Sequence, residues 1–393
     1  MASRDAVTRE RLDGIESLRG FAALSIILFH LVWVAHVQLP TTIDITKYYL
    51  GMGVPLFFVI SAFSLSYGYL GRLDRGEGLV NYYVRRFARI APLLYFMLVV
   101  QVTLAWFVWN IGYSLSNITL NVTFLFNLVP TLVDGIVPAS WSIGVEMIFY
   151  LILPGVLILT RGYSGSLLLI ALSLVLAGEF SAAVLNAKDI NPQFAHHGFA
   201  VCLPYFCFGF LALHMYRSFA QRSRVEQDVF AYLLYLLTPV TIWVLVFHSS
   251  LFTPFGVGPV NRIHSSMWGL PFAFLVVAIS LRPVWILVNP LTQFWGRVSF
   301  SLYLTHPNII FFLYKGGLYE AISSACGNIP SFAFPACAAV TIALVSIASW
   351  VTFTYIEMPG IALGHRIIQQ GLRKAVMGTR PRAGVAMAAQ PQA

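Results

Sequence analysis

Long runs of apolar residues alternate with short polar segments along most of the chain. A helix of about 20 apolar residues crosses the roughly 30 Å hydrocarbon core of a bilayer. Runs close to that length recur ten times, at Phe21–Leu39, Val54–Leu70, Ile90–Ile111, Trp141–Thr160, Ser164–Leu185, Phe199–Tyr216, Val229–Phe247, Ser265–Leu281, Val298–Tyr314 and Phe332–Ile356. The pattern predicts an all-α, polytopic integral membrane protein with about ten transmembrane helices.

One further apolar stretch, residues 118–137, does not fit this pattern. A full crossing there would invert every later loop. We therefore interpret it as a re-entrant or interfacial segment. We also expect irregular backbone where it runs into Pro138 and Trp141, since such backbone persists at membrane depth only when buried in protein or lining a wet cavity.

Positive charges set the orientation of these spans. With both termini in the cytoplasm, twenty of the 24 Lys and Arg residues lie in inner segments, and the outer segments hold only Lys47, Lys188, Arg262 and Lys315. Cytoplasmic loops of membrane proteins carry such an excess. Both termini are therefore predicted to be cytoplasmic.

Composition supports the same class of protein. Hydrophobic residues make up 58% of the chain and charged residues 10%, whereas soluble domains carry about 25% charged residues. The net charge of +9 is spread between the spans, so we expect membrane lipid and no nucleic acid as a partner. Four cysteines are too few for a disulfide framework, although a Cys326–Cys337 bridge stays open. We predict a transmembrane domain over residues 1–366 and a disordered cytoplasmic tail over residues 367–393.

Two histidines lie inside predicted spans, where ionisable residues are costly and often functional. His30 follows Arg19, at the inner mouth of the first span, by eleven residues. It is therefore about 16 Å deep, near the bilayer midplane. His306 lies about 12 Å into the ninth span. His30 is a candidate general base and His306 a candidate for the same cavity. The alternative is a structural hydrogen bond, for His306 to a carbonyl that Pro307 leaves free one turn back.

Glu146 is the carboxylate of a Ser140–Glu146 motif and is expected about one turn inside the outer end of the fourth span. A carboxylate in hydrocarbon must be protonated, paired or hydrated. Pairing with an imidazole would fix the tautomer of that ring and raise its basicity. The alternative is a hydrogen bond that holds the irregular entry of this span. Ser61 is a weaker candidate, because a serine in a helix often bonds back to its own turn.

Arg85, Arg86 and Arg89 cluster at the inner start of the third span. Arg85 and Arg89 are four residues apart and share a helix face, while Arg86 is expected to project elsewhere. Guanidinium forks bind phosphate through paired hydrogen bonds, and a helix N-terminus favours anions. The cluster is a candidate site for a phosphorylated cytoplasmic cofactor, and the alternative is a topology anchor on lipid phosphates.

Five motifs occur in an order that resembles the membrane acyltransferase-3 family, with coverage over about residues 12–366. They are Leu12–Gly20 leading to His30, Gly53–Ala62, Arg85–Pro92, Trp141–Glu146 and Ser299–His306, and the ending Tyr355–Pro359 also fits. Ala62 stands where the family usually has glycine.

The resemblance implies transfer of an acyl group, most often acetyl from acetyl-coenzyme A (acetyl-CoA) as co-substrate, to a hydroxyl of a surface polysaccharide or lipid-linked glycan. It also implies a bacterial inner membrane as the location and no metal. The family's catalytic histidine corresponds to His30, and its arginine motif to Arg85, Arg86 and Arg89, with Arg19 at the matching spacing. We expect Glu146 to orient His30 or bind the acceptor. His306, Trp141 and Ser142 are expected to contact the substrate, and an acyl-histidine intermediate stays open as an alternative to general-base catalysis.

A different class of function is a transporter or proton-coupled permease, in which the midplane histidines and Glu146 would form a proton relay. No inverted repeat is visible in the sequence to support it. A third hypothesis is a non-catalytic partner of a glycan synthase.

Overall fold

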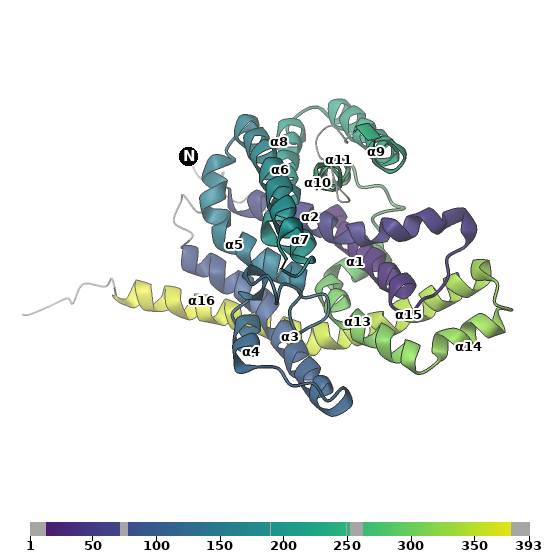
Figure 1. Ribbon diagram of the computed structural model, residues 1–393. Helices are drawn as coiled ribbons and strands as arrows, with labels where there is room; N and C mark the ends of the chain where they lie inside the picture. Colours follow the sequence, from purple (N-terminus) through teal and green to yellow (C-terminus); the bar gives the residue numbers. More distant parts are fainter. Residues whose placement is uncertain (1–12, 71–77, 189, 249, 252–261, 379–393) are drawn as a thin grey trace, which may run out of the picture.

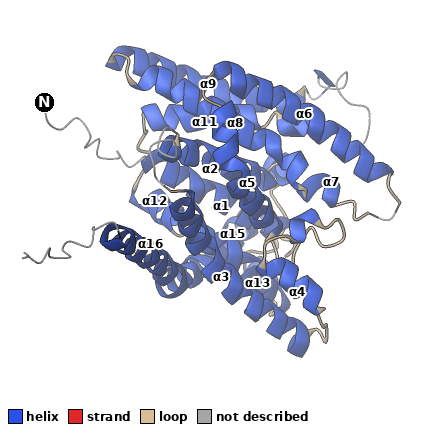
Figure 2. Ribbon diagram, turned by 90° about the vertical axis from the view of Figure 1, so that its left-hand side faces the viewer, coloured by secondary structure: helices blue, strands red, loops and turns tan. Residues whose placement is uncertain are grey.

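The computed structural model describes residues 13–70, 78–188, 190–248, 250–251 and 262–378, and the regular structure in this part of the chain is helical (Figure 2). In chain order the α-helices are α1 (Asp13–Trp33), α2 (Gly53–Tyr69), α3 (Leu79–Val108), α4 (Leu115–Val122), α5 (Trp141–Leu159), α6 (Tyr163–Asn186), α7 (Phe194–His197), α8 (Phe199–Ala220), α9 (Arg224–Phe247), α10 (Arg262–Ser266), α11 (Gly269–Leu281), α12 (Pro290–Arg297), α13 (Ser299–Lys315), α14 (Leu318–Ala325), α15 (Pro330–Thr352) and α16 (Met358–Gly378). Short 3₁₀ turns are η1 (Thr41–Tyr48), η2 (Leu50–Met52) and η4 (Phe126–Leu128), and η6 (Phe353–Glu357) is a π-helical turn that joins α15 to α16. The all-α class is confirmed.

Nine helical stretches among the described residues are long and apolar enough to cross a membrane. They correspond to nine of the ten predicted spans, which confirms a polytopic membrane protein. The one remaining predicted span, the ninth along the chain, is α13, which has 17 residues. At 1.5 Å per residue it is about 25 Å long, a little short of the roughly 30 Å hydrocarbon core.

Helix α1 lies in the middle of the molecule and packs against α2, α11, α12 and α13 (Figure 1). Its contact with α12 is close because Gly20 has no side chain: a Cβ there would lie 2.8 Å from the carbonyl oxygen of Thr292. Ser17 and Thr292 also join the two helices through a hydroxyl–hydroxyl hydrogen bond of 3.1 Å. This packing fixes the helix that carries both Arg19 and His30.

The segment before α5 contains no helix long enough to cross a membrane. It consists of the eight-residue α4, the short turn η4 and irregular backbone, in which Phe124 (φ 62°) and Ala139 (φ 67°) adopt the left-handed conformation. Phe126, Val137 and Ser140 from this segment are buried. The prediction of irregular backbone at the entry to α5 is therefore confirmed, and the segment folds inward onto the protein.

The predicted tail differs from the structure at its start. Residues 367–378 continue α16 instead of forming a disordered tail, and residues 379–393 lie outside the described part. The sequence from Ile367 to Gln370 has helix-compatible residues and no proline, so nothing ends the helix there. Helix α16 also packs on α3, where Gly364 faces Ala88. Cys326 and Cys337 are free thiols, which excludes a bridge between them.

Candidate active site

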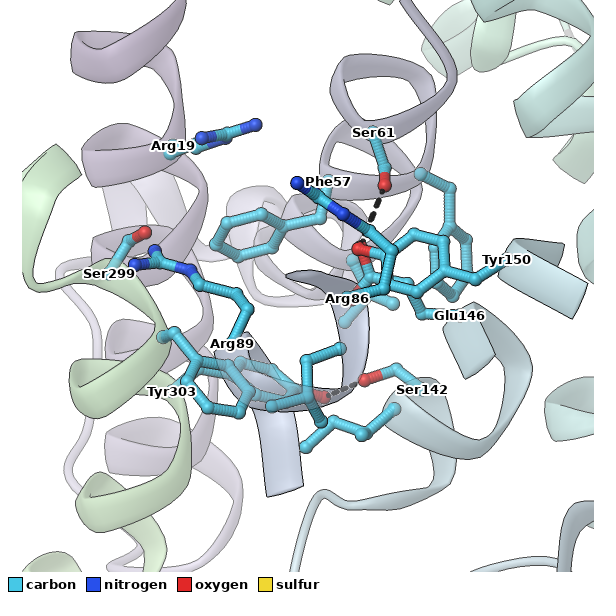
Figure 3. A pocket seen from close by; sticks show the side chains of 15 residues that line it. Arg19, Phe57, Ser61, Arg86, Arg89, Ser142, Glu146, Tyr150, Ser299 and Tyr303 are labelled. Atoms are coloured by element: carbon cyan, nitrogen blue, oxygen red, sulfur yellow. Dashed lines mark hydrogen bonds between the residues drawn. The ribbon is translucent and has the colours of Figure 1, made fainter. Parts of the chain in front are cut away.

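A cavity of about 110 Å³ opens among α1, α2, α3, α5 and α13 (Figure 3). Its polar lining comes from Arg19, Ser61, Arg86, Arg89, Ser142, Glu146, Tyr150, Ser299 and Tyr303, and apolar residues such as Phe57 complete it. We call it the arginine cavity. Because the lining residues come from five helices far apart in the sequence, only the tertiary fold creates this site.

The face of α3 that lines the cavity passes through Arg86, Arg89 and Ile90. Residues three and four apart lie on one helix face, so these side chains point the same way. Arg85 is not among the lining residues. Arg86, which was expected to project away from the face shared by Arg85 and Arg89, therefore lines the cavity together with Arg89.

Arg89 is paired with Glu357, a residue that the sequence analysis did not select. The Arg89 Nη1 and Glu357 Oε1 atoms are 2.6 Å apart, and the Glu357 side chain is fully buried. Ser301 Oγ donates a hydrogen bond of 2.9 Å to the other carboxylate oxygen. A buried carboxylate needs such partners, so part of the charge of Arg89 is already balanced within the protein.

Arg86 has a different environment. Its guanidinium carbon lies 6.0 Å from the ring centroid of Tyr69 and 5.9 Å from that of Tyr150, which are cation–π distances. Within the described residues, the buried Nε of Arg86 has no hydrogen-bond partner. A buried donor without a partner is unfavourable, and an anionic ligand would satisfy it.

Glu146 does not contact His30. It accepts a hydrogen bond of 2.7 Å from Ser61 Oγ and another from the Tyr150 hydroxyl. It lies about one turn after the start of α5, as predicted, but it shares a cavity with Arg19, which was expected at the inner mouth of the first span. The reason is the inward-folded segment before α5, which starts this helix inside the protein. Ser61 therefore bonds across to α5, and does not bond only within its own helix.

Ser142 lines the arginine cavity as expected, whereas Trp141 does not. Ser142 Oγ donates to the Tyr303 hydroxyl at 2.7 Å, and that hydroxyl donates to the Ala139 carbonyl at 2.8 Å. Trp141 stacks on His197, with ring centroids 4.0 Å apart and an interplanar angle of 12°. The indole is thus turned away from the cavity, and its expected contact with substrate has no support in the structure.

The structure brings His30 and His306 together. His306 Nε2 lies 3.1 Å from His30 Nδ1. His30 Nδ1 is also 3.0 Å from the Ile26 carbonyl oxygen, and His306 Nδ1 is 3.1 Å from the Leu302 carbonyl oxygen. His306 therefore bonds a carbonyl one turn back and also meets His30, although the bonded carbonyl is that of Leu302 and the one that Pro307 leaves free is that of Tyr303.

These contacts assign the tautomers of both rings. A carbonyl oxygen only accepts hydrogen bonds, so Nδ1 of each histidine carries the proton. In the neutral rings, Nε2 of His306 then accepts from His30 Nδ1. The one lone pair left on the His30 ring is at Nε2, and a nitrogen in that state can take a proton from a reacting group.

Tyr303 connects the histidine pair to the arginine cavity. Its ring lines the cavity, and its centroid lies 5.9 Å from that of His306. His30 is not itself among the cavity-lining residues. The pair therefore lies next to the cavity, farther along α1 than Arg19 and farther along α13 than Tyr303.

Comparison with known proteins identifies related sequences. The sequence model of an acyltransferase domain, acyltransferase-3, matches residues 12–350. ORF330 of Acidianus two-tailed virus, which is named provisionally as an acetyltransferase, is 24% identical over 305 residues, or 74% of this chain and 81% of the viral protein. No solved structure matches the chain. The matched domain contains the residues of the arginine cavity and both histidines, whereas Glu357 follows it.

Proposed function

The chain belongs to the acyltransferase-3 family, and from this premise we propose that it moves an acetyl group from acetyl-CoA to a hydroxyl of a surface polysaccharide or lipid-linked glycan. It is a multi-pass membrane acyltransferase. We also propose that it lies in a bacterial inner membrane, and we assign roles to individual residues below. Its family relationship favours this class over the transporter hypothesis.

In this proposal the arginine cavity holds a phosphate-bearing end of the donor. Arg19 and Arg86 supply the positive charge, together with the part of the Arg89 charge that Glu357 leaves unbalanced. Ligand pockets for drug-sized molecules are about 300–1,000 Å³, whereas this cavity measures about 110 Å³. It would therefore take only one part of coenzyme A. The thioester arm would extend along α1 toward His30, about 16 Å from Arg19.

His30 acts as the general base in the proposed reaction. The observation that carries this role is the bond from His30 Nδ1 to the Ile26 carbonyl, which leaves the lone pair at Nε2. As the acceptor oxygen attacks the thioester carbonyl carbon, Nε2 takes the hydroxyl proton. A C–O bond forms, the C–S bond breaks, and the same proton passes to the departing sulfur to give coenzyme A.

His306 is a positioning residue in this scheme. Once His30 is protonated, its Nδ1–H still donates to His306 Nε2, and a hydrogen bond from a charged donor is stronger than one from a neutral donor. His306 thus stabilises the imidazolium that forms during transfer, as the carboxylate does in a catalytic histidine–carboxylate pair. The Leu302 carbonyl keeps His306 in the tautomer that this requires.

Two measurements on the same protein test the proposal. Purified full-length protein is given acetyl-CoA with labelled acetyl, and both coenzyme A release and label in an added glycan are followed. We expect the two to rise together. Mass analysis of surface glycans should also show the loss of an acetyl group in a strain that lacks this protein. Coenzyme A release without any labelled product, or unchanged glycans, would contradict the proposed acceptor.

A further inference from the structure

A second cavity, of about 540 Å³, lies at the C-terminal end of α1 and beside α14. Its polar and aromatic lining is His36, Gln38, Tyr314, Tyr319, Glu320, Ser323, Ser324 and Asn328. We call it the His36–Glu320 cavity. Its volume falls within the range of about 300–1,000 Å³ typical of ligand pockets, and none of its lining residues belongs to the site described above.

Two neighbouring helices connect the arginine cavity to this one. Along α1 the order is Arg19, His30 and then His36 just past the helix end, and along α13 it is Tyr303, His306 and Tyr314. The contact between His30 and His306 sets the two helices side by side. The His36 and Tyr314 rings then meet again, with centroids 5.8 Å apart. The helices therefore run in the same direction, with the histidine pair between the two cavities.

The distance from the histidine pair to the His36–Glu320 cavity is short. His306 and Tyr314 are eight residues apart on one helix, or about 12 Å. Arg19 and His30 are about 16 Å apart on α1. A group held in either cavity is thus within reach of the same histidine, from opposite directions.

The lining of the His36–Glu320 cavity suits an uncharged ligand rich in hydroxyl groups. It offers hydroxyl, amide and carboxylate groups, with Glu320 as its acidic residue, and no Lys or Arg is among these described lining residues. A phosphate or carboxylate ligand would find no ammonium or guanidinium in the lining itself, since the Lys315 ammonium packs 5.6 Å from the Tyr314 ring centroid and does not line the cavity. Aromatic side chains such as Tyr314 can cover the apolar face of a sugar ring, while the polar groups bond its hydroxyls.

The backbone on both sides of the cavity is held in a sparsely populated conformation. His36 (φ 55°) and Asn328 (φ 58°) are both left-handed. Such residues persist where the surrounding structure fixes them, and they concentrate at functional sites. In this structure they place two polar side chains on the cavity wall.

We propose that the His36–Glu320 cavity binds the sugar ring that carries the acceptor hydroxyl. This inference rests on the proposed function for the fate of the bound sugar, but binding itself can be measured without any transfer. The acceptor then reaches His30 from the α14 side, and the donor reaches it from the arginine cavity.

The test uses the full chain in lipid nanodiscs and saturation-transfer NMR. The probe is an equimolar mixture of the methyl glycosides of glucose, galactose, mannose and N-acetylglucosamine. Ser324→Trp puts a large side chain into the cavity. Ala325→Trp is the matched control, because Ala325 is the exposed next residue of α14 and does not line the cavity. Retained helix content and a single gel-filtration peak show that each variant is folded.

We expect saturation of the sugar ring protons with the wild type and with Ala325→Trp, and a fall of about tenfold or more in apparent affinity with Ser324→Trp. Absence of signal from every glycoside, or an equal signal from both variants, overturns the inference. Acetyl transfer on the same samples separates the two proposals. Sugar binding without transfer by the wild type contradicts the proposed function alone. Unchanged acceptor KM in an active Ser324→Trp protein contradicts this cavity alone.

Discussion

His30 combines a fixed tautomer with a nitrogen free to accept a proton. The Ile26 carbonyl and His306 both lie beside Nδ1, so the ring cannot present that nitrogen to a substrate. A nucleophilic acyl-histidine route would need the same Nε2 atom. The two mechanisms therefore share one residue and differ in whether acetyl becomes attached to it.

Replacing His30 by alanine should abolish most transfer while leaving the protein folded. Loss of a general base costs about 10²–10⁴-fold in rate. The measurement is coenzyme A release with labelled glycan, at equal amounts of folded protein. His214→Ala is the matched control, because His214 is another buried histidine on a spanning helix and bonds the Thr160 carbonyl. Near-normal transfer by a folded His30→Ala protein would remove His30 from the mechanism.

His306→Ala tests the stabilisation of protonated His30. It removes the acceptor beside Nδ1 but leaves the Ile26 carbonyl in place. A hydrogen bond to a charged group is worth about 1.5–3 kcal/mol, so kcat should fall by about 10- to 150-fold. The KM for acetyl-CoA should change little, since His306 does not line the arginine cavity. His306→Asn should restore part of kcat. A purely structural role predicts instead parallel loss of folded protein and no rescue.

The helical geometry of α3 explains which arginines share the arginine cavity. Arg86 and Arg89 lie on the face of α3 that turns toward α1 and α5, whereas Arg85 is not among the lining residues. The three adjacent guanidinium groups are thus separated into two environments by the helical geometry alone.

Arg86→Ala and Arg85→Ala should therefore differ in their effect on donor affinity. Loss of a charge-assisted contact at Arg86 should raise the KM for acetyl-CoA by about 10- to 150-fold, from about 1.5–3 kcal/mol. Arg85→Ala should leave that KM within about threefold, because Arg85 does not line the arginine cavity. The Arg86 effect should disappear with acetyl-pantetheine, which lacks the nucleotide phosphates. Equal KM values for the two variants would contradict this division of α3.

Most helices could be predicted from the sequence because each depends on a local apolar run. His30 and the arginine motif were also found, because their residue types are rare inside such runs. The pairing of Arg89 with Glu357 was not predicted, since it joins helices at distant positions in the chain. The signal for it was present in the Tyr355–Pro359 motif. The meeting of Glu146 and Arg19 in one cavity was not predicted either, because it depends on the irregular segment before α5, whose path no periodicity describes.

At the scale of the whole molecule, the two cavities and the histidine pair form a continuous series along α1 and α13. The positive charges of the sequence predict that the arginine end faces the cytoplasm. Glu146 lies at this same end, so it does not mark the path of the acceptor. The His36–Glu320 cavity is at the other end of the series.

Membrane vesicles of both orientations give the corresponding prediction. Acetyl-CoA supplied at the cytoplasmic face should label a glycan confined to the opposite face, because the two substrates meet at His30 from opposite directions. The control is the His30→Ala protein in the same vesicles. If labelling requires both substrates on the cytoplasmic face, the proposed sidedness is wrong, although the transfer reaction itself would stand.

The ion pair between Arg89 and Glu357 also has a consequence for biogenesis. During synthesis Arg89 enters the membrane long before the ribosome makes Glu357, so the guanidinium spends that interval without its final partner. Lipid phosphates at the cytoplasmic surface are the natural temporary partners for such a group. Arg89 would thus first help to orient the newly inserted chain, and would exchange headgroups for a buried carboxylate only when the last helices dock. A chain released at residue 350, the end of the matched domain, would never complete that exchange.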